Sequence, residues 1–172
     1  NPVVSLPDAD QVRKALASCE LVVVSDCVKQ TDTMALAHIC LPARTWGEKS
    51  GTVTNSERRI SRQRAFLQAP GKSMPDWWLI SQVAQRMGHA TAFAYESERD
   101  IFREHAALSG YENAGTRDFD ISGLAELDQQ AYDDLEPVQW PVFVKAHGTP
   151  RMFEDGRFFY PDKKARFIPI QP

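Results

Sequence analysis

The chain has 172 residues, of which 42% are hydrophobic and 25% are charged, with a net charge of −3 at pH 7. This length is enough for one domain, or for one domain and an appendage, with a sizeable apolar core. The acidic balance excludes the broad basic field that nucleic-acid binding requires.

The first predicted elements are a helix and a strand. Apolar residues at helical spacing after Pro7 predict a short helix that residues 18–20 end. Residues 21–24 form an unbroken apolar run, which is typical of a parallel strand buried on both faces.

A second helix and strand complete a β-α-β unit. Thr31 is placed to cap a helix that runs through Ala37, and residues 39–41 form a second buried strand stopped by Pro42. This order implies a right-handed crossover and an α/β fold with a doubly wound, mainly parallel sheet.

Residues 44–74 lack sustained helical periodicity, and loops this long are usually functional. Within them, residues 52–54 and 60–62 are predicted to pair as short strands across a turn at residues 55 and 56.

Asp76 is placed to cap an amphipathic helix that Gly88 stops. Its apolar face is predicted to hold Leu79, Ile80, Val83, Ala84 and Met87.

The last predicted helices lie between residues 97 and 135. Ser97 and Asp100 form a capping-box pattern for a helix that buries Ile101, Phe102 and Leu108. Residues 122–135 are predicted to hold another helix. Beyond them the chain is extended, with a weak hairpin of residues 157–160 against residues 165–168.

Ser25 and Asp26 follow the first buried strand, at the sheet edge where open α/β sheets bind ligands. An Asp there can accept hydrogen bonds from a ribose or a guanine. The alternative is that one of the two residues only caps the next turn.

Lys49 lies in a turn-rich run with Gly51, Thr52 and Asn55, and its ammonium suits a phosphate oxygen. The alternative is a solvated loop lysine. For Asp76, a role as a helix cap competes with a role as a guanine acceptor, because a carboxylate can bond to both N1–H and N2–H of that base.

No grouping of the four histidines predicts a protein-built metal site, and no Ser-His-Asp or paired-carboxylate arrangement emerges from spacing. Cys19, Cys27 and Cys40 lack a C-x-x-C spacing, so we expect reduced, mostly buried thiols and no iron–sulfur site in this stretch. No apolar run is long enough to span a membrane and no signal peptide opens the chain, which favours a cytoplasmic protein with no membrane partner. Because Asn1 opens it instead of Met, we expect a piece of a longer polypeptide.

Three segments, residues 21–26, 46–59 and 70–78, resemble the cofactor-binding α/β domain of the molybdopterin oxidoreductases, the dimethyl sulfoxide reductase superfamily. Residues 117–124 (Arg-Asp-Phe-Asp-Ile-Ser-Gly-Leu), followed by Gln-Trp-Pro at 139–141, look most like the assimilatory nitrate reductase branch. The resemblance runs from Asn1 to about residue 167.

The resemblance implies binding of a molybdenum bis(molybdopterin guanine dinucleotide) cofactor. It places a guanosine contact at Ser25 and Asp26, a cofactor contact at Lys49 and the guanine acceptor at Asp76. Asn1 matches the Asn of the family's Gly-Thr-Asn-Pro turn beneath the same cofactor. Residues 57–59 resemble a Glu-Arg-Arg signature, which a structural ion pair between Glu48 or Glu57 and one of the arginines explains nearly as well.

The resemblance also implies the parent protein's activity, the reduction of nitrate to nitrite. Residues 1–141 would form the cofactor domain, and residues 142–172 an extended linker toward a C-terminal β-barrel domain. A 4Fe–4S cluster and the cysteine ligand to molybdenum would lie outside this stretch, which alone should not be catalytic. Its partners would be the remaining domains, an electron donor protein or domain, and nitrate.

Two alternatives stay open. The first is the same domain of a formate dehydrogenase-type molybdoenzyme, which shares the Ser-Asp, Glu-Lys-x-Gly-Thr and Pro-Asp-Trp patterns. The second is a non-catalytic nucleotide-binding or interaction module, although no Gly-x-Gly-x-x-Gly or Walker loop is present.

Overall fold

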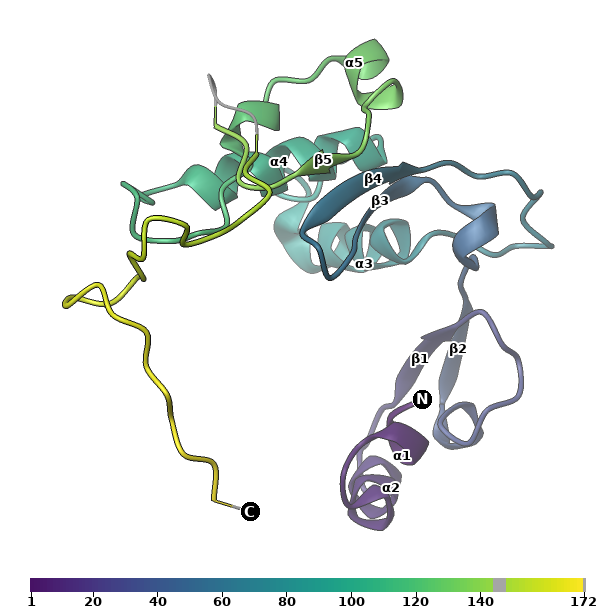
Figure 1. Cartoon of the computed structure of the whole chain (residues 1–172). Helices are drawn as coiled ribbons and strands as arrows, with labels where there is room; N and C mark the ends of the chain where they lie inside the picture. The colour runs from purple at the N-terminus through teal and green to yellow at the C-terminus, as the bar shows by residue number, and fades with distance from the viewer. Residues whose placement is uncertain (144–147, 172) are drawn as a thin grey trace. The chain divides into compact units, whose positions relative to one another are not determined.

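The computed structural model describes residues 1–143 and 148–171 (Figure 1). The chain forms two compact units. Residues 1–50 and 64–96 make the first unit, and residues 51–63 and 97–172 make the second. The predicted boundary near residue 141 stays a prediction.

The first unit contains the predicted parallel strand pair. After α1 (Pro2–Ser5) and α2 (Ala9–Ala17), β1 (Val23–Asp26) pairs in parallel with β2 (Ile39–Pro42). The register joins Ser25 to Leu41 and Asp26 to Pro42. Ser25 and Asp26 therefore lie at the carboxyl end of β1, as predicted.

The helix predicted between these strands is wrong in extent. Only a single 3₁₀ turn, η1 (Met34–Leu36), is present. The hydroxyl of Thr31 does cap it, since Met34 N donates to Thr31 Oγ1 at 3.1 Å. Ala37 is already extended (φ −77°, ψ 135°), so the chain leaves the turn at once to enter β2.

The prediction that both strands are buried on both faces is also wrong. Val23 is 48% exposed and Ile39 is 45% exposed. Burial on both faces needs helices packed above and below a wider sheet. The described residues instead form a two-stranded sheet and a separate three-stranded sheet, a mixed α/β arrangement.

The helix after the long loop is α3 (Asp76–Ala84), which continues into a π-type turn, η3 (Gln85–His89). Gly88, the predicted stop, is at φ +95° and interrupts the helical backbone, because glycine adopts this conformation freely, but η3 continues to His89. The prediction that Asp76 caps the helix is wrong. Pro75 occupies the cap position, and Asp76 is the first helical residue.

The second unit begins with the predicted hairpin. β3 (Gly51–Thr54) and β4 (Arg59–Gln63) are antiparallel, and β5 (Val138–Gln139) joins the other edge of β4. The sheet order is β3-β4-β5. Alternating side chains place Ile60, which is 3% exposed, in the core.

The helix α4 (Glu98–Gly110) begins with the predicted capping box of Ser97 and Asp100. It contributes Phe102 and Ala106 to the core, whereas Leu108 is 58% exposed, so its predicted burial is wrong. The fully assembled core of this unit consists of Ile60, Phe102, Ala106, Ile121, Leu124, Tyr132 and Val142.

The predicted helix over residues 122–135 is replaced by two short pieces, η4 (Ser122–Leu124) and α5 (Gln129–Asp133). The segment that carries the nitrate reductase resemblance is therefore a packing element. Asp120 and Ile121 are buried, and Gly123 N donates to Val142 O at 2.9 Å.

The hairpin predicted over residues 157–168 is not formed. Phe158 N donates to Lys163 O at 3.0 Å and Lys163 N to Tyr160 O at 2.9 Å, which makes a local turn. Residues 164–171 have no strand pairing, and Phe167 is 95% exposed. Without a packed partner, the alternating apolar residues of this stretch have nothing to bury against.

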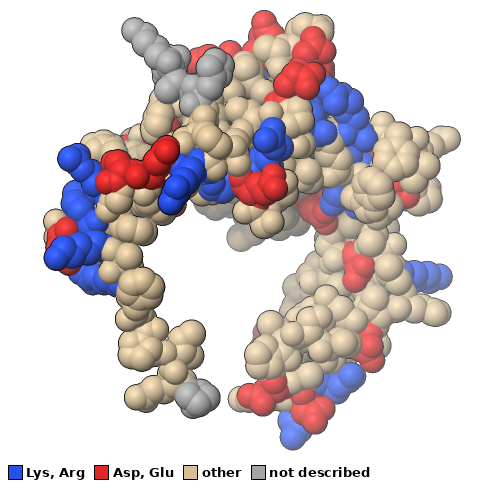
Figure 2. All heavy atoms as spheres, in the orientation of Figure 1, with Lys and Arg blue, Asp and Glu red and all other residues tan. Residues whose placement is uncertain are grey.

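The surface of the chain carries its cysteines and a mixture of charged side chains. Cys19, Cys27 and Cys40 are all exposed, so the prediction of buried thiols is wrong. On the face drawn in Figure 2, basic and acidic side chains are intermixed. No helix among the described residues has the length and apolar character needed to cross a membrane.

Candidate functional site

Three of the predicted site residues meet in the first unit. The hydroxyl of Ser25 donates to Asp76 Oδ1 at 3.2 Å, and the ammonium of Lys49 donates to Asp76 Oδ2 at 2.8 Å. Both oxygens of one carboxylate are thus held by side chains from a strand end and from a loop.

Local backbone structure explains why they meet. The chain before α3 runs beside the end of β2, because Met74 N donates to Pro42 O and Arg44 N donates to Met74 O, each at 3.1 Å. This pairing brings the first turn of α3 to the carboxyl end of the parallel strands. Asp76 therefore starts its helix next to Ser25.

Lys49 directly follows a short capped turn that fixes its position. The 3₁₀ turn η2 (Trp46–Glu48) carries a capping box, in which Thr45 N donates to Glu48 Oε2 at 3.0 Å and the Thr45 side chain accepts from the backbone of Glu48. Lys49 is extended immediately after it. Glu48, which sequence alone left as a possible ion-pair partner, thus fixes the turn that precedes Lys49.

The electrostatics favour an ionised Asp76. Burial alone would raise the pKa of this carboxyl, but the hydrogen bond and charge of Lys49 and the hydroxyl of Ser25 outweigh it, so the pKa is lowered. The Asp76 side chain remains 48% exposed and that of Lys49 31% exposed. A carboxylate offers about four acceptor sites, so Ser25 and Lys49 do not exhaust those of Asp76.

The other two predicted residues lie elsewhere in this unit. Asp26 Oδ1 accepts from Val28 N at 2.9 Å, which is the turn-capping alternative. Asn1 Oδ1 accepts from the Thr33 hydroxyl at 2.6 Å, and that buried hydroxyl also accepts from Val3 N at 3.3 Å. In the described part of the chain, no contact joins Asp26 or Asn1 to Asp76.

An apolar groove beside Asp76 was missed by sequence reasoning. It has a volume of about 400 Å³, and its lining residues are Val23, Ser25, Leu41, Asp76, Leu79, Ile80, Val83, Ala84 and Met87. The helical spacing of the α3 residues was correctly read as one face. That spacing carries no information on whether the face is covered, and here Ile80 is 62% exposed and Met87 71% exposed.

The Glu-Arg-Arg signature has a structural role in the second unit. Arg58 donates to the carbonyl of Trp140 and, through Nη2, to that of Thr149 at 2.8 Å. Its guanidinium also lies 5.3 Å from the centre of the Trp140 ring. Neither acid suggested from sequence is its partner, because these are backbone carbonyls.

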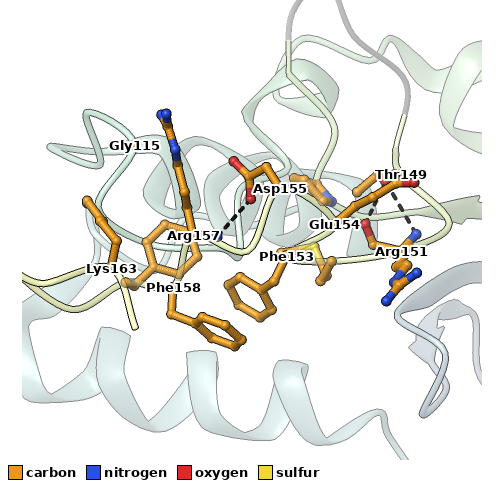
Figure 3. Close-up of a pocket in the computed structure, with 12 residues that line it drawn as sticks. Gly115, Thr149, Arg151, Phe153, Glu154, Asp155, Arg157, Phe158 and Lys163 are labelled. Carbon is orange, nitrogen blue, oxygen red and sulfur yellow. Dashed lines mark hydrogen bonds between the residues drawn. The ribbon is translucent and has the colours of Figure 1, made fainter. Parts of the chain in front are cut away.

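A larger hollow of about 460 Å³ lies in the second unit around residues 149–163 (Figure 3). Its centre is aromatic, with the rings of Phe153 and Phe158 stacked at 4.6 Å. Arg151, Arg157 and Lys163 lie around it, but their side chains point in different directions. This geometry does not form a convergent anion site.

Among residues 1–143 and 148–171, no three His, Cys, Asp or Glu side chains are grouped in a way that could hold a metal ion. The chemistry available at the Asp76 cluster is instead hydrogen bonding from a ligand's N–H groups and attraction of an anion by Lys49.

The sequence model of one protein family, described as molybdopterin oxidoreductase, matches residues 1–86, half of the chain. The chain belongs to the molybdopterin oxidoreductase family. The matched region contains all five predicted site residues, including the Ser25, Lys49 and Asp76 cluster.

Similar proteins in the molybdopterin oxidoreductase family include two nitrate reductases. That of Klebsiella oxytoca is 54% identical over the whole chain, which spans 19% of that protein. That of Shewanella frigidimarina is 46% identical over 98% of the chain and 18% of that protein. The F420-dependent formate dehydrogenase subunit alpha of Methanocaldococcus jannaschii is 31% identical over 99% of the chain and 23% of that protein. The chain thus spans about a fifth of the length of these relatives.

Proposed function

We propose that this chain is the part of a molybdenum-dependent nitrate reductase that binds the guanosine and pyrophosphate of a bis(molybdopterin guanine dinucleotide) cofactor. The observation that carries the proposal is the meeting of Ser25, Lys49 and Asp76 at one carboxylate. It occurs in a chain that is 54% identical to a nitrate reductase.

The donor set fits this cofactor. The ionised Asp76 carboxylate can accept from both N1–H and N2–H of a guanine, whereas adenine offers no such pair of donors. Lys49 supplies the positive charge that a pyrophosphate oxygen requires. Asp26, at the end of β1, and Asn1, bonded to Thr33 in the following loop, lie outside the Ser25, Lys49 and Asp76 cluster and would contact the ribose and the underside of the cofactor separately.

The parent protein would supply what this stretch lacks. We propose that further strands extend the β1–β2 pair into a doubly wound sheet, and that residues 142–172 lead from the cofactor domain (residues 1–141) toward a β-barrel domain. A 4Fe–4S cluster and a cysteine ligand to molybdenum would belong to other parts of the same cytoplasmic enzyme, which would take electrons from a donor protein or domain.

Bound molybdenum would supply the oxygen-atom transfer by which nitrate takes up two electrons and two protons to give nitrite and water. The residues described here would orient the cofactor and hold its nucleotide end. The second candidate is formate oxidation, since a formate dehydrogenase subunit is 31% identical over 99% of the chain. Assay of the full-length protein with nitrate and with formate separates the two.

The cofactor proposal is tested in the full-length protein by replacing Asp76 with Ala. We expect the variant to lose bound molybdenum and guanine nucleotide while retaining its melting temperature to within a few degrees, because Asp76 makes no helix-cap bond. Asp32→Ala is the matched control, since Asp32 is an exposed acid of the same unit whose partner is Arg13 at 3.6 Å. Normal molybdenum and nucleotide contents in the Asp76 variant would refute the proposal.

A further inference from the structure

Ser25, an exposed residue of β1, is joined by its hydroxyl to the first residue of α3, Asp76. Successive side chains of a strand point to opposite faces, so Ser25 and Asp26 cannot both face the same partner. The contacts follow this rule, since Ser25 donates to Asp76 whereas Asp26 accepts from Val28 N.

The carboxylate of Asp76 is held at both ends. Ser25 Oγ lies 3.2 Å from Oδ1, and Lys49 Nζ lies 2.8 Å from Oδ2. A carboxylate with a donor on each oxygen loses freedom to rotate about its terminal bond, which is otherwise a broad torsion. Its remaining acceptor sites then have a fixed direction.

We infer that Ser25 is a positioning residue that acts through Asp76, orienting the carboxylate so that it distinguishes a base edge with two N–H donors from an edge with one. This rests on the proposed function, because the base edge is that of the cofactor's guanine. Ser25 then contributes to nucleotide selection without needing to touch the nucleotide.

The alternative is that Ser25 contacts the ribose directly. The two roles give different results. A direct contact would affect guanosine, inosine and adenosine nucleotides equally, since their riboses are identical. A positioning role would act on the base. Its loss would therefore weaken binding of guanosine nucleotides more than that of inosine nucleotides, because inosine lacks the 2-amino group that donates to the second carboxylate oxygen.

The first measurement uses the 172-residue chain with GDP, IDP and ADP as probes, by isothermal titration. We expect the chain to prefer GDP over IDP by about tenfold, the scale of one hydrogen bond to a charged group. Ser25→Ala should weaken GDP binding about fivefold and reduce the preference for GDP over IDP. Ser25→Thr, which keeps the hydroxyl, should restore the preference.

Ser5→Ala is the matched control, an exposed serine of the same unit outside the cluster. It should leave all three affinities unchanged. An equal loss of affinity for GDP, IDP and ADP in Ser25→Ala would overturn the inference in favour of direct ribose contact.

The second measurement needs no nucleotide. Carboxyl-carbon NMR titration of Asp76 should give a higher pKa in Ser25→Ala than in the wild-type chain, because a donor to the ionised form is lost. An unchanged Asp76 pKa would overturn the positioning role whatever the binding result. If this pKa rises but no guanosine nucleotide binds to any form of the chain, the positioning of Asp76 stands and the proposed cofactor role fails.

Discussion

The ammonium of Lys49 lies 2.8 Å from Asp76 Oδ2, across 27 positions of sequence. This contact ties the turn that ends at Glu48 to the first residue of α3. Because both side chains remain partly exposed, the pair is accessible to a ligand and to salt.

We expect Lys49→Met to reduce the free energy of unfolding by about 0.2–1 kcal/mol, the range for partly exposed ion pairs. The loss should shrink in high salt, which screens the interaction in the wild-type chain. Urea unfolding at low and high ionic strength measures both effects. Arg13→Met is the control and should cost less, because its pair with Asp32 is longer, at 3.6 Å, and more exposed. Equal losses for the two variants would contradict this expectation.

Asp120 should make the second unit sensitive to acid. Burial alone would raise the pKa of this carboxyl, but hydrogen bonds from Ser122 and Asn113 and the charge of Arg117 lower it below its usual value of 3.8. A lowered folded-state pKa gives stability that is present above the unfolded pKa and is lost as the pH falls through the folded pKa.

Asp120→Asn is therefore expected to reduce the free energy of unfolding at pH 7 by about 1.5–3 kcal/mol, the scale for hydrogen bonds to a charged group. The difference from the wild-type chain should narrow below about pH 4, where the wild-type carboxyl also loses its charge. Urea unfolding from pH 7 to pH 2 tests this. Asp118→Asn, which removes the charge but keeps a side-chain oxygen that can accept from Phe119 N, should show a smaller loss at pH 7. A pH-independent difference for Asp120→Asn would show that the charge is not involved.

Tyr132→Phe is expected to leave stability unchanged or to raise it by up to about 1 kcal/mol. The Tyr132 hydroxyl is buried and has no hydrogen-bond partner among the described residues. Removing it therefore removes the free-energy cost of burying an unpaired hydroxyl in the folded state. The ring itself is needed, because the Arg62 guanidinium lies 4.0 Å from its centre and Phe102 packs against it. Tyr132→Leu should therefore lower the melting temperature. A clear loss of stability in Tyr132→Phe would reveal a partner for the hydroxyl.

Gly123→Ala is expected to destabilise the second unit by several degrees of melting temperature. A Cβ at this position would lie 2.6 Å from the backbone oxygen of Phe143, which cannot move aside as a flexible side chain can. Gly51→Ala is the matched control, since a Cβ there meets nothing within 4 Å. Equal melting temperatures for the two variants would contradict the close packing of η4 against residues 142 and 143.

The sequence was most informative for features that depend on residues close to one another along the chain. The capping box of Ser97 and Asp100, the hairpin across residues 55 and 56 and the strand pair around Ser25 were predicted correctly, since each follows from local propensity or apolar runs. For the site, the residue types at a strand end and in a turn-rich loop pointed to Ser25 and Lys49, whereas Asp76 was favoured as a ligand-binding residue only through the family resemblance.

The errors concern what covers each element, which depends on distant residues. Leu108 fits the apolar face of α4, and Val23 fits a buried strand, yet neither is covered in this structure. The position of Asp76 after Pro75 predicts a helix cap. Its carboxylate instead accepts hydrogen bonds from Ser25 and Lys49, because the segment around Met74 pairs with the end of β2, which the local sequence does not reveal.

Residues 51–63 belong to the second unit, although the segments on either side of them belong to the first. As the chain is synthesised, the β3–β4 hairpin therefore leaves the ribosome before α4 and the later segments that bury Ile60. The first unit must likewise wait for residues 64–96. The segments of the two units alternate along the sequence, so no single cut of the chain separates one unit from the other. We expect the chain to become resistant to protease only after nearly all of it has been made.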